Sequence, residues 1–99
     1  MPEYDYKRLD NVLHSRIRLA IVSAIIGSGD IEFTALRDAV GATDGNMNSH
    51  LKRLEKEGYI YVEKNFINRK PVTIYSLTES GIKNFEEYVK ELERYIRKN

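Results

Sequence analysis

The sequence predicts an α+β domain that is mostly helical, in which three helices are followed by a β-hairpin and a long last helix. Apolar residues recur at spacings of three and four along residues 9–25, which is typical of a helix with one buried face. Residues 59–64 and 72–77 are rich in aromatic and β-branched residues, which is typical of paired strands. A chain of 99 residues has room for one core, so residues 1–99 are expected to form a single domain.

The first two helices are delimited by residues that end or cap helices. We expect the first helix to begin at Leu9 and to end in the glycine-containing segment 27–30. A short extended segment, residues 31–33, follows it. Thr34 is expected to cap a second short helix, and Gly41 is expected to end it.

A third helix is predicted over residues 44–57, with Thr43 or Asp44 as its cap and Gly58 at its end. A tight connection separates it from the second helix, and two helices joined in this way form a helix-turn-helix. The residues expected to face the core from this third helix are Met47, Leu51 and Leu54.

The hairpin follows directly after this helix, which makes the predicted architecture a winged helix-turn-helix. The polar residues 65–71 are expected to form the hairpin loop, and Pro71 is expected to stiffen its exit because proline fixes φ. Thr78 is expected to cap the last helix, which is predicted over residues 79–97.

The last helix carries an apolar seam that predicts a homodimer. The seam consists of Ile82, Phe85, Val89, Leu92 and Ile96, which are spaced three, four, three and four over about two heptads. A helix of about 18 residues extends for some 27 Å, which is more than a small core covers. The alternative is that the seam packs wholly within one chain. The residues expected at the dimer interface are Leu13, Ile17, Ile82, Phe85, Tyr88, Val89, Leu92, Tyr95 and Ile96.

The outward face of the third helix is polar and is the main candidate for contact with DNA. Its N-terminal half holds short polar side chains, which can bond base edges in the major groove. Its basic residues lie further along, where phosphate contact is expected, although Arg53 could reach a guanine. The alternative is that these residues only cap and solvate the helix. The outward and flanking residues are Gly45, Asn46, Asn48, Ser49, Lys52, Arg53 and Lys56.

Further DNA contacts are expected at the starts of the second and third helices, from Thr34, Thr43 and Asp44. His50 lies near the apolar side of its helix, so a packed or phosphate-contacting role is expected for it.

The wing, residues 64–71, is expected to contact the minor groove or the DNA backbone, as basic wing tips often do. The alternative is a solvated hairpin whose charges prevent edge-to-edge pairing. Phe66 and Ile67 are unusual at a polar tip, and they either fold back onto the domain or contact a partner. The wing residues proposed for DNA binding are Lys64, Asn68, Arg69 and Lys70.

Composition limits the other functions. The net charge is +1, and the basic excess lies in residues 44–70, which hold six basic and four acidic groups. The chain has no cysteine and only two histidines, so neither a metal site nor thiol chemistry is expected. No catalytic arrangement and no phosphate-binding glycine loop is found, so neither an enzyme nor a cofactor is expected.

No apolar run is long enough to span a membrane, and the N-terminus does not look like a signal peptide, so a cytoplasmic protein is expected. The lack of cysteine and glutamine, with many charged residues, matches the composition of proteins from very hot environments.

Residues 43–60, TDGNMNSHLKRLEKEGYI, resemble the recognition helix of winged-helix regulators of the MarR and ArsR type. They look most similar to small single-domain archaeal and bacterial members, whose helix opens with T-D-G-N. Residues 75–81, YSLTESG, are similar to the turn between the wing and the last helix of the same family. The resemblance covers nearly the whole chain.

The resemblance implies a transcriptional regulator that dimerises through its terminal helices and binds a pseudo-palindromic operator in double-stranded DNA. Metal sensing is not implied, because the ArsR relatives that sense metals use cysteines or His/Asp clusters. Whether an effector exists stays open. An alternative function is a winged-helix module that binds protein or RNA, for which an apolar recognition face would be expected.

Overall fold

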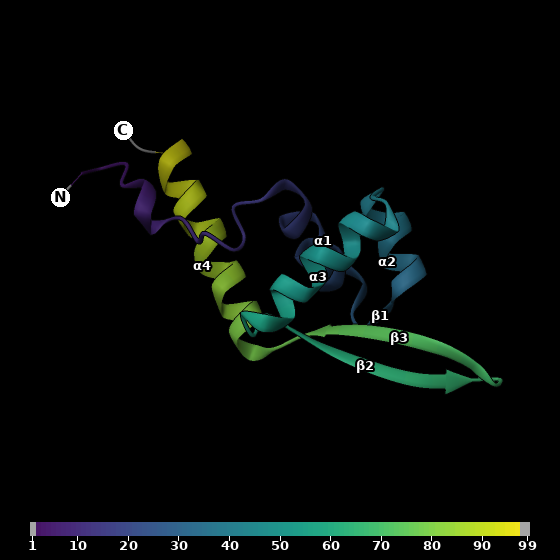
Figure 1. Ribbon diagram of the computed structural model, residues 1–99. Coiled ribbons are helices and arrows are strands. Elements are labelled where there is room, and N and C mark those ends of the chain that lie inside the picture. The colour runs from purple at the N-terminus through teal and green to yellow at the C-terminus, as the bar shows by residue number, and fades with distance from the viewer. Residues whose placement is uncertain (1, 98–99) are drawn as a thin grey trace.

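The computed structural model describes residues 2–97, so residues 1, 98 and 99 of the predicted domain lie outside the described residues. Its order of elements confirms the predicted α+β, mostly helical winged helix-turn-helix (Figure 1). A short 3₁₀ helix, Tyr6–Arg8, precedes the first α-helix. The elements are α1 (Arg16–Ser28), β1 (Ile31–Glu32), α2 (Phe33–Val40), α3 (Asp44–Lys56), β2 (Ile60–Ile67), β3 (Lys70–Leu77) and α4 (Glu79–Ile96).

The first helix begins at Arg16, so the predicted start at Leu9 is wrong. Asp10 turns the chain before the helix, because its Oδ1 atom accepts the backbone N–H groups of Val12 and Leu13 at 2.8 and 3.0 Å. Both of these apolar residues are buried. The apolar spacing before residue 16 therefore reflects packing against the core and not helical structure.

The cap of α2 is Glu32, so the prediction of Thr34 as the cap is wrong. The Glu32 carboxylate accepts the N–H of Thr34 at 3.3 Å, and Thr34 lies in the first turn of the helix. Phe33 belongs to the helix and not to the short strand. Gly41 ends the helix as predicted, with a left-handed φ of 75°.

α3 begins at Asp44 as predicted and ends at Lys56, one residue before the predicted end. Thr43 is its cap, because its hydroxyl accepts the N–H of Asn46 at 3.2 Å. Gly58 follows the last turn with a φ of 81°, a conformation that glycine adopts without steric cost. The three apolar residues predicted to face inward, Met47, Leu51 and Leu54, are all buried.

The wing is longer and its turn tighter than predicted. β2 and β3 pair as far as Ile67 and Lys70, so the loop predicted over residues 65–71 is wrong. The turn consists of Asn68 and Arg69, both with positive φ, as in the tight turns that suit twisted hairpins. Polar and apolar residues are mixed on both faces of this exposed ribbon, so its sequence shows no strand-like alternation and resembles that of a loop.

The sheet has the order β1-β3-β2 and is antiparallel throughout. Pro71 lies within β3, opposite Phe66 of β2. Proline has no N–H to donate to a neighbouring strand. None is needed at this position, because β1 pairs with β3 only at Ile74 and Tyr75.

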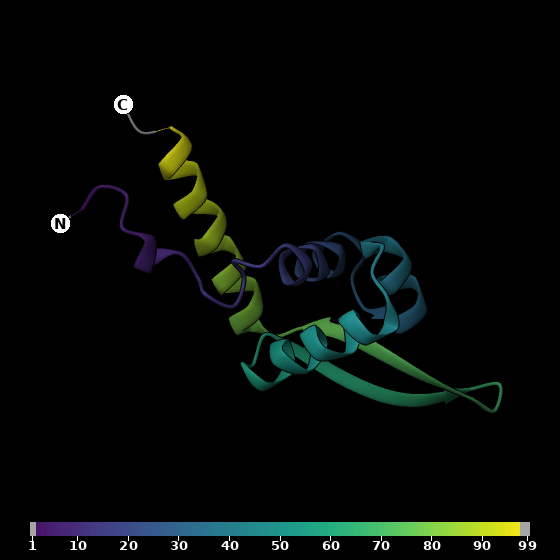
Figure 2. The same cartoon turned by 45° about the horizontal axis from the view of Figure 1, so that its top comes forward.

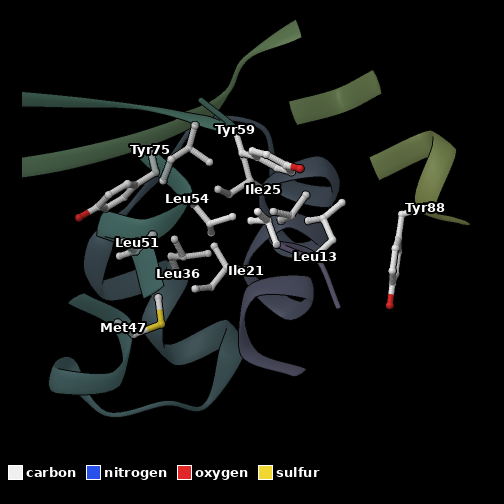
Figure 3. Packing of buried hydrophobic residues seen from close by; sticks show 13 residues of the cluster. Leu13, Ile21, Ile25, Leu36, Met47, Leu51, Leu54, Tyr59, Tyr75 and Tyr88 are labelled. Carbon is white, nitrogen blue, oxygen red and sulfur yellow. The ribbon is translucent and has the colours of Figure 1, made fainter. Parts of the chain in front are cut away.

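The core lies where α1, α2 and α3 meet the base of the wing (Figure 3). Leu36 and Leu54 are wholly buried there, as is Ile21 of α1. The far half of the wing and the end of α4 extend beyond this core, and the chain spans 56 × 25 × 22 Å.

The N-terminal segment, which comprises the described residues before α1, runs beside α4 (Figure 2). The Tyr95 hydroxyl donates to the carbonyl oxygen of Asp5 at 2.7 Å, and the rings of Tyr4 and Tyr95 meet edge to face. The carboxylate of Glu91 lies 3.4 Å from Arg8. One face of α4 is therefore covered by the chain's own N-terminus.

Candidate nucleic-acid interface

The predicted recognition face of α3 is exposed along its whole length. Ser49 donates its hydroxyl to the carbonyl of Asn46 at 3.3 Å, so its proton is used inside the helix. Within residues 2–97, the Asn48 side chain makes no hydrogen bond and can pair with an outside group. The exposed residues of this face are Gly45, Asn46, Asn48, Ser49, Lys52, Arg53 and Lys56.

Asp44, Thr43 and Thr34 lie at the helix starts, in agreement with the sequence prediction. The Asp44 carboxylate accepts from Arg37 of α2 at 2.8 Å, and this hydrogen bond is the main cause that raises the pKa of Arg37. The pair ties α2 to the first turn of α3. Asp44 and Thr43 thus have structural roles here, whereas Thr34 is exposed.

The wing projects away from the helices (Figure 1). Lys64 lies on the face of β2 that Val62 and Ile60 share, and Ile60 is buried against the core. A groove of about 370 Å³ lies between this face and α3, and Asn48, Lys52 and Lys64 are among its lining residues. Recognition helix and wing therefore border one shared groove.

The wing tip is exposed, including the four residues predicted to bind DNA, Lys64, Asn68, Arg69 and Lys70. Phe66 is 77% exposed and Ile67 is 54% exposed, so neither folds back onto the domain. Contact with a partner stays a prediction for both.

His50 is half-buried, and its ring is hydrogen-bonded to Arg18, a residue to which the sequence gave no functional role. Arg18 of α1 places its Nη1 atom 3.0 Å from His50 Nδ1 and donates its Nε–H to the carbonyl of Val12 at 2.6 Å. Burial, followed by the charges of Arg18 and Arg53, lowers the pKa of His50. Arg18 is 32 residues away in the chain, and no local pattern could have paired the two.

The predicted dimer residues divide into two groups. Leu13 is wholly buried and Tyr88 is 3% exposed, so both belong to the core of the single chain, and their assignment to a dimer interface is corrected. Tyr88 is fixed there by a 2.7 Å hydrogen bond between its hydroxyl and His14 Nδ1. Ile82 is 44% exposed and Ile96 is 80% exposed. The remaining predicted residues are half-buried, namely Ile17, Phe85, Val89, Leu92 and Tyr95.

The described part of the chain holds neither a cluster of potential metal ligands nor a helix that could span a membrane. Between residues 2 and 97, no three His, Cys, Asp or Glu side chains gather as metal ligands would. None of the helices in that range has both the length and the apolar character required to cross a bilayer.

The chain matches known proteins in sequence and in structure. Residues 17–96 match the family model of the winged helix DNA-binding domain. The uncharacterized protein MJ0432 of Methanocaldococcus jannaschii is 32% identical over 81 residues, which cover 82% of this chain and 88% of that protein.

Among solved structures, a transcriptional regulator homologue protein from Pyrococcus horikoshii OT3 superposes with a TM-score of 0.87 at 24% identity, covering 97% of this chain and 95% of that one. MarR superposes with a TM-score of 0.77 at 22% identity, covering 94% of this chain and 67% of that one. The chain therefore belongs to the winged helix DNA-binding domain family, and its fold is that of MarR-like transcriptional regulators.

Proposed function

We propose that the protein acts in the cytoplasm as a homodimeric transcriptional regulator that binds a pseudo-palindromic operator in double-stranded DNA. In this proposal α3 enters the major groove, and the wing contacts the minor groove or the backbone. The observation that carries the proposal is the exposed polar face of α3 beside a protruding hairpin with a basic tip. A helix with short polar side chains in its N-terminal half can approach base edges closely.

The polar face of α3 also favours DNA over a protein partner, because a protein-binding helix would present apolar residues there. Lys52, Arg53 and Lys56 are exposed in the second half of the helix and are within the region expected to follow the phosphates. Gly45 carries no side chain and has no heavy atom within 4 Å of where a Cβ would stand, so the helix can lie close to the bases at that point.

The test begins by selecting bound duplexes from a random pool, followed by titration of the selected and a random duplex at several salt concentrations. About 6–10 phosphate contacts per dimer would reduce affinity by roughly 10³–10⁵ between 50 and 200 mM salt. A salt response that is flat, or equal affinity for single-stranded RNA, would contradict the proposal.

The binding mode is tested by Asn48→Ala. Its amide is free and exposed on the reading face, so its loss should reduce discrimination at one operator position by about 1–3 kcal/mol. Affinity for the random duplex should persist, since phosphate contacts supply it. Lys83→Ala, on the exposed side of α4, is the control and should change neither affinity. A parallel fall of both affinities would assign Asn48 a positioning role only.

A further inference from the structure

A cluster of basic side chains lies beside α3, formed by Arg18, His50 and Arg53. Arg18 reaches from α1 to His50, with its Nη1 atom 3.0 Å from Nδ1 of the imidazole. Arg53 follows His50 on α3. Burial, followed by the charge of Arg53, lowers the pKa of Arg18. Among residues 2–97, no carboxylate lies within ion-pair distance of either arginine. The two arginines repel each other because no acid lies between them, and a bound anion would relieve that repulsion.

The bond between Arg18 and His50 determines which ring nitrogen carries the proton. A guanidinium group has only donors, so His50 Nδ1 must accept, and the imidazole is neutral with its proton on Nε2. Arg18 is itself held in place, because its Nε–H donates to the Val12 carbonyl at 2.6 Å. Within the described range, no residue accepts a hydrogen bond from Nε2, so the imidazole has one donor to offer an outside group.

A hollow of about 580 Å³ adjoins this ring. His50, Asn46 and Arg16 are among its lining residues, and the lining includes no carboxylate. Asn46 also belongs to the polar face of α3, so an anion in the hollow would lie directly beside the proposed reading face. Of the basic cluster, His50 lines the hollow, and Arg16 supplies the positive charge of its lining.

We propose that His50 and Arg16 bind one backbone phosphate of the operator at this hollow, in which the Nε2–H group of His50 donates to a phosphate oxygen while the nearby charges of Arg18 and Arg53 attract the phosphate. Arg18 acts as a positioning residue, because it holds the imidazole in the tautomer that presents this donor. A phosphodiester suits the site, since it carries one negative charge and only accepts hydrogen bonds. This inference rests on the proposed DNA binding and specifies which atom of His50 would contact the backbone and which residue orients it.

The test uses selected duplexes in which single phosphates are replaced, one at a time, by neutral methylphosphonates. Several positions per half-site should weaken binding, because about 6–10 phosphates are contacted per dimer. At one of them the loss in the wild-type protein, about tenfold and on the scale of a charge-assisted hydrogen bond, should depend on His50. His50→Phe keeps a ring of similar shape without a donor, and it should lose nothing further at that position. Lys83→Gln on α4 is the control and should retain the full tenfold loss.

The role of Arg18 is tested separately by nitrogen NMR of the imidazole. The wild-type protein should show His50 protonated on Nε2 alone, and Arg18→Met should show a mixture of tautomers together with a weaker phosphate effect. This measurement does not require His50→Phe to fold. A proton on Nδ1 in the wild-type protein would overturn the assignment.

The outcomes separate this inference from the proposed function. Failure of the wild-type protein to bind any duplex would reject the DNA-binding function itself. Normal binding in which every methylphosphonate affects the wild-type protein and His50→Phe equally would overturn only the phosphate site. Free phosphate offers the same oxygens, so inorganic phosphate is titrated in the NMR experiment. The DNA contact would also be overturned if inorganic phosphate shifted the His50 nitrogen signals as much as the duplex does, and if no methylphosphonate position distinguished the wild-type protein from His50→Phe.

Discussion

Gly81 joins the last helix to the base of the wing and the end of α3. A Cβ atom at this position would meet the backbone carbonyl group of Tyr59, whose carbon would lie at 3.0 Å. The same carbonyl accepts the N–H of Thr78 at 3.1 Å, and the Thr78 hydroxyl donates to the carbonyl of Gly58 at 2.6 Å. The absence of a side chain at residue 81 thus permits the close approach that anchors α4.

We therefore expect Gly81→Ala to lower the free energy of unfolding by about 1–3 kcal/mol, because backbone atoms must move to admit the methyl group. Alanine has a higher helix propensity than glycine, so helix propensity alone would predict a gain in stability for Gly81→Ala. Gly27→Ala is the matched control, since residue 27 is also helical and a Cβ there meets nothing within 4 Å. Urea unfolding should show the control unchanged or more stable by up to ~1 kcal/mol. Equal shifts in the two variants would contradict the steric account.

Residue roles that depend on neighbouring positions were predictable, and those that depend on distant contacts were not. The caps Thr43 and Thr78 follow from their places before apolar periodic segments, and the structure confirms both. The bond between Arg18 and His50 depends on how α1 crosses α3, which no local spacing encodes. Asp44 illustrates the same limit, because its partner Arg37 lies on another helix.

The wing shows strain at the position proposed for DNA contact. Arg69 adopts a φ of 66° in the two-residue turn, a conformation that is uncommon for a residue with a long side chain. Asn68 tolerates its φ of 51° better, because asparagine is enriched in left-handed conformations. Strained residues of this kind are found preferentially at functional sites.

Arg69→Gly should stabilise the protein by about 0.5–1 kcal/mol, because glycine adopts this conformation freely, and should weaken binding to all duplexes alike. The slope of log affinity against log salt should become shallower by about one for each phosphate that the variant no longer neutralises. Arg69→Gln removes the charge but keeps the strain, so it should weaken binding without the gain in stability. Urea unfolding and fluorescence anisotropy measure the two effects. Unchanged binding in Arg69→Gly would show that the tip does not reach DNA.

Elements with one buried face were predicted better than exposed ones. The period of α3 follows from its buried stripe, and its predicted boundaries differ from the observed ones by a single residue. The outer halves of β2 and β3 have neither face buried, so hydrophobic alternation cannot reveal them. For residues 9–13 the sequence predicted a helix that is absent, because the residues buried in this turn are spaced as they would be on a helix.

At the scale of the whole molecule, α4 presents three faces. Tyr88, Glu91 and Tyr95 share the face covered by the N-terminal segment. The apolar seam occupies a neighbouring face and is exposed at both ends, at Ile82 and Ile96. The third face carries charged residues. The covered face could not be foreseen from the periodicity of α4 alone, because the N-terminal segment that covers it is not a regular helix.

A symmetric dimer through the seam would explain why α4 projects beyond the core. Two-fold symmetry would present two copies of α3, as a pseudo-palindromic operator with half-sites about 34–36 Å apart requires. Each half-site would then increase the occupancy of the other, because the second binding event becomes intramolecular. Dimerisation and operator affinity should therefore be lost together.

Ile96→Asp tests this coupling without disturbing the core, because the Ile96 side chain is 80% exposed in the single chain. A charge buried between two apolar seams is costly, so sedimentation should show a species of 11.5 kDa, the mass of one chain. Affinity for the full operator should fall towards that for a single half-site, while the free energy of unfolding of the monomer stays unchanged. Ser80→Asp places the same charge on an exposed position of α4 away from the seam, and it should remain dimeric. If Ile96→Asp dimerises normally, the seam is not the interface, and the exposed apolar residues of the wing become the next surface to test.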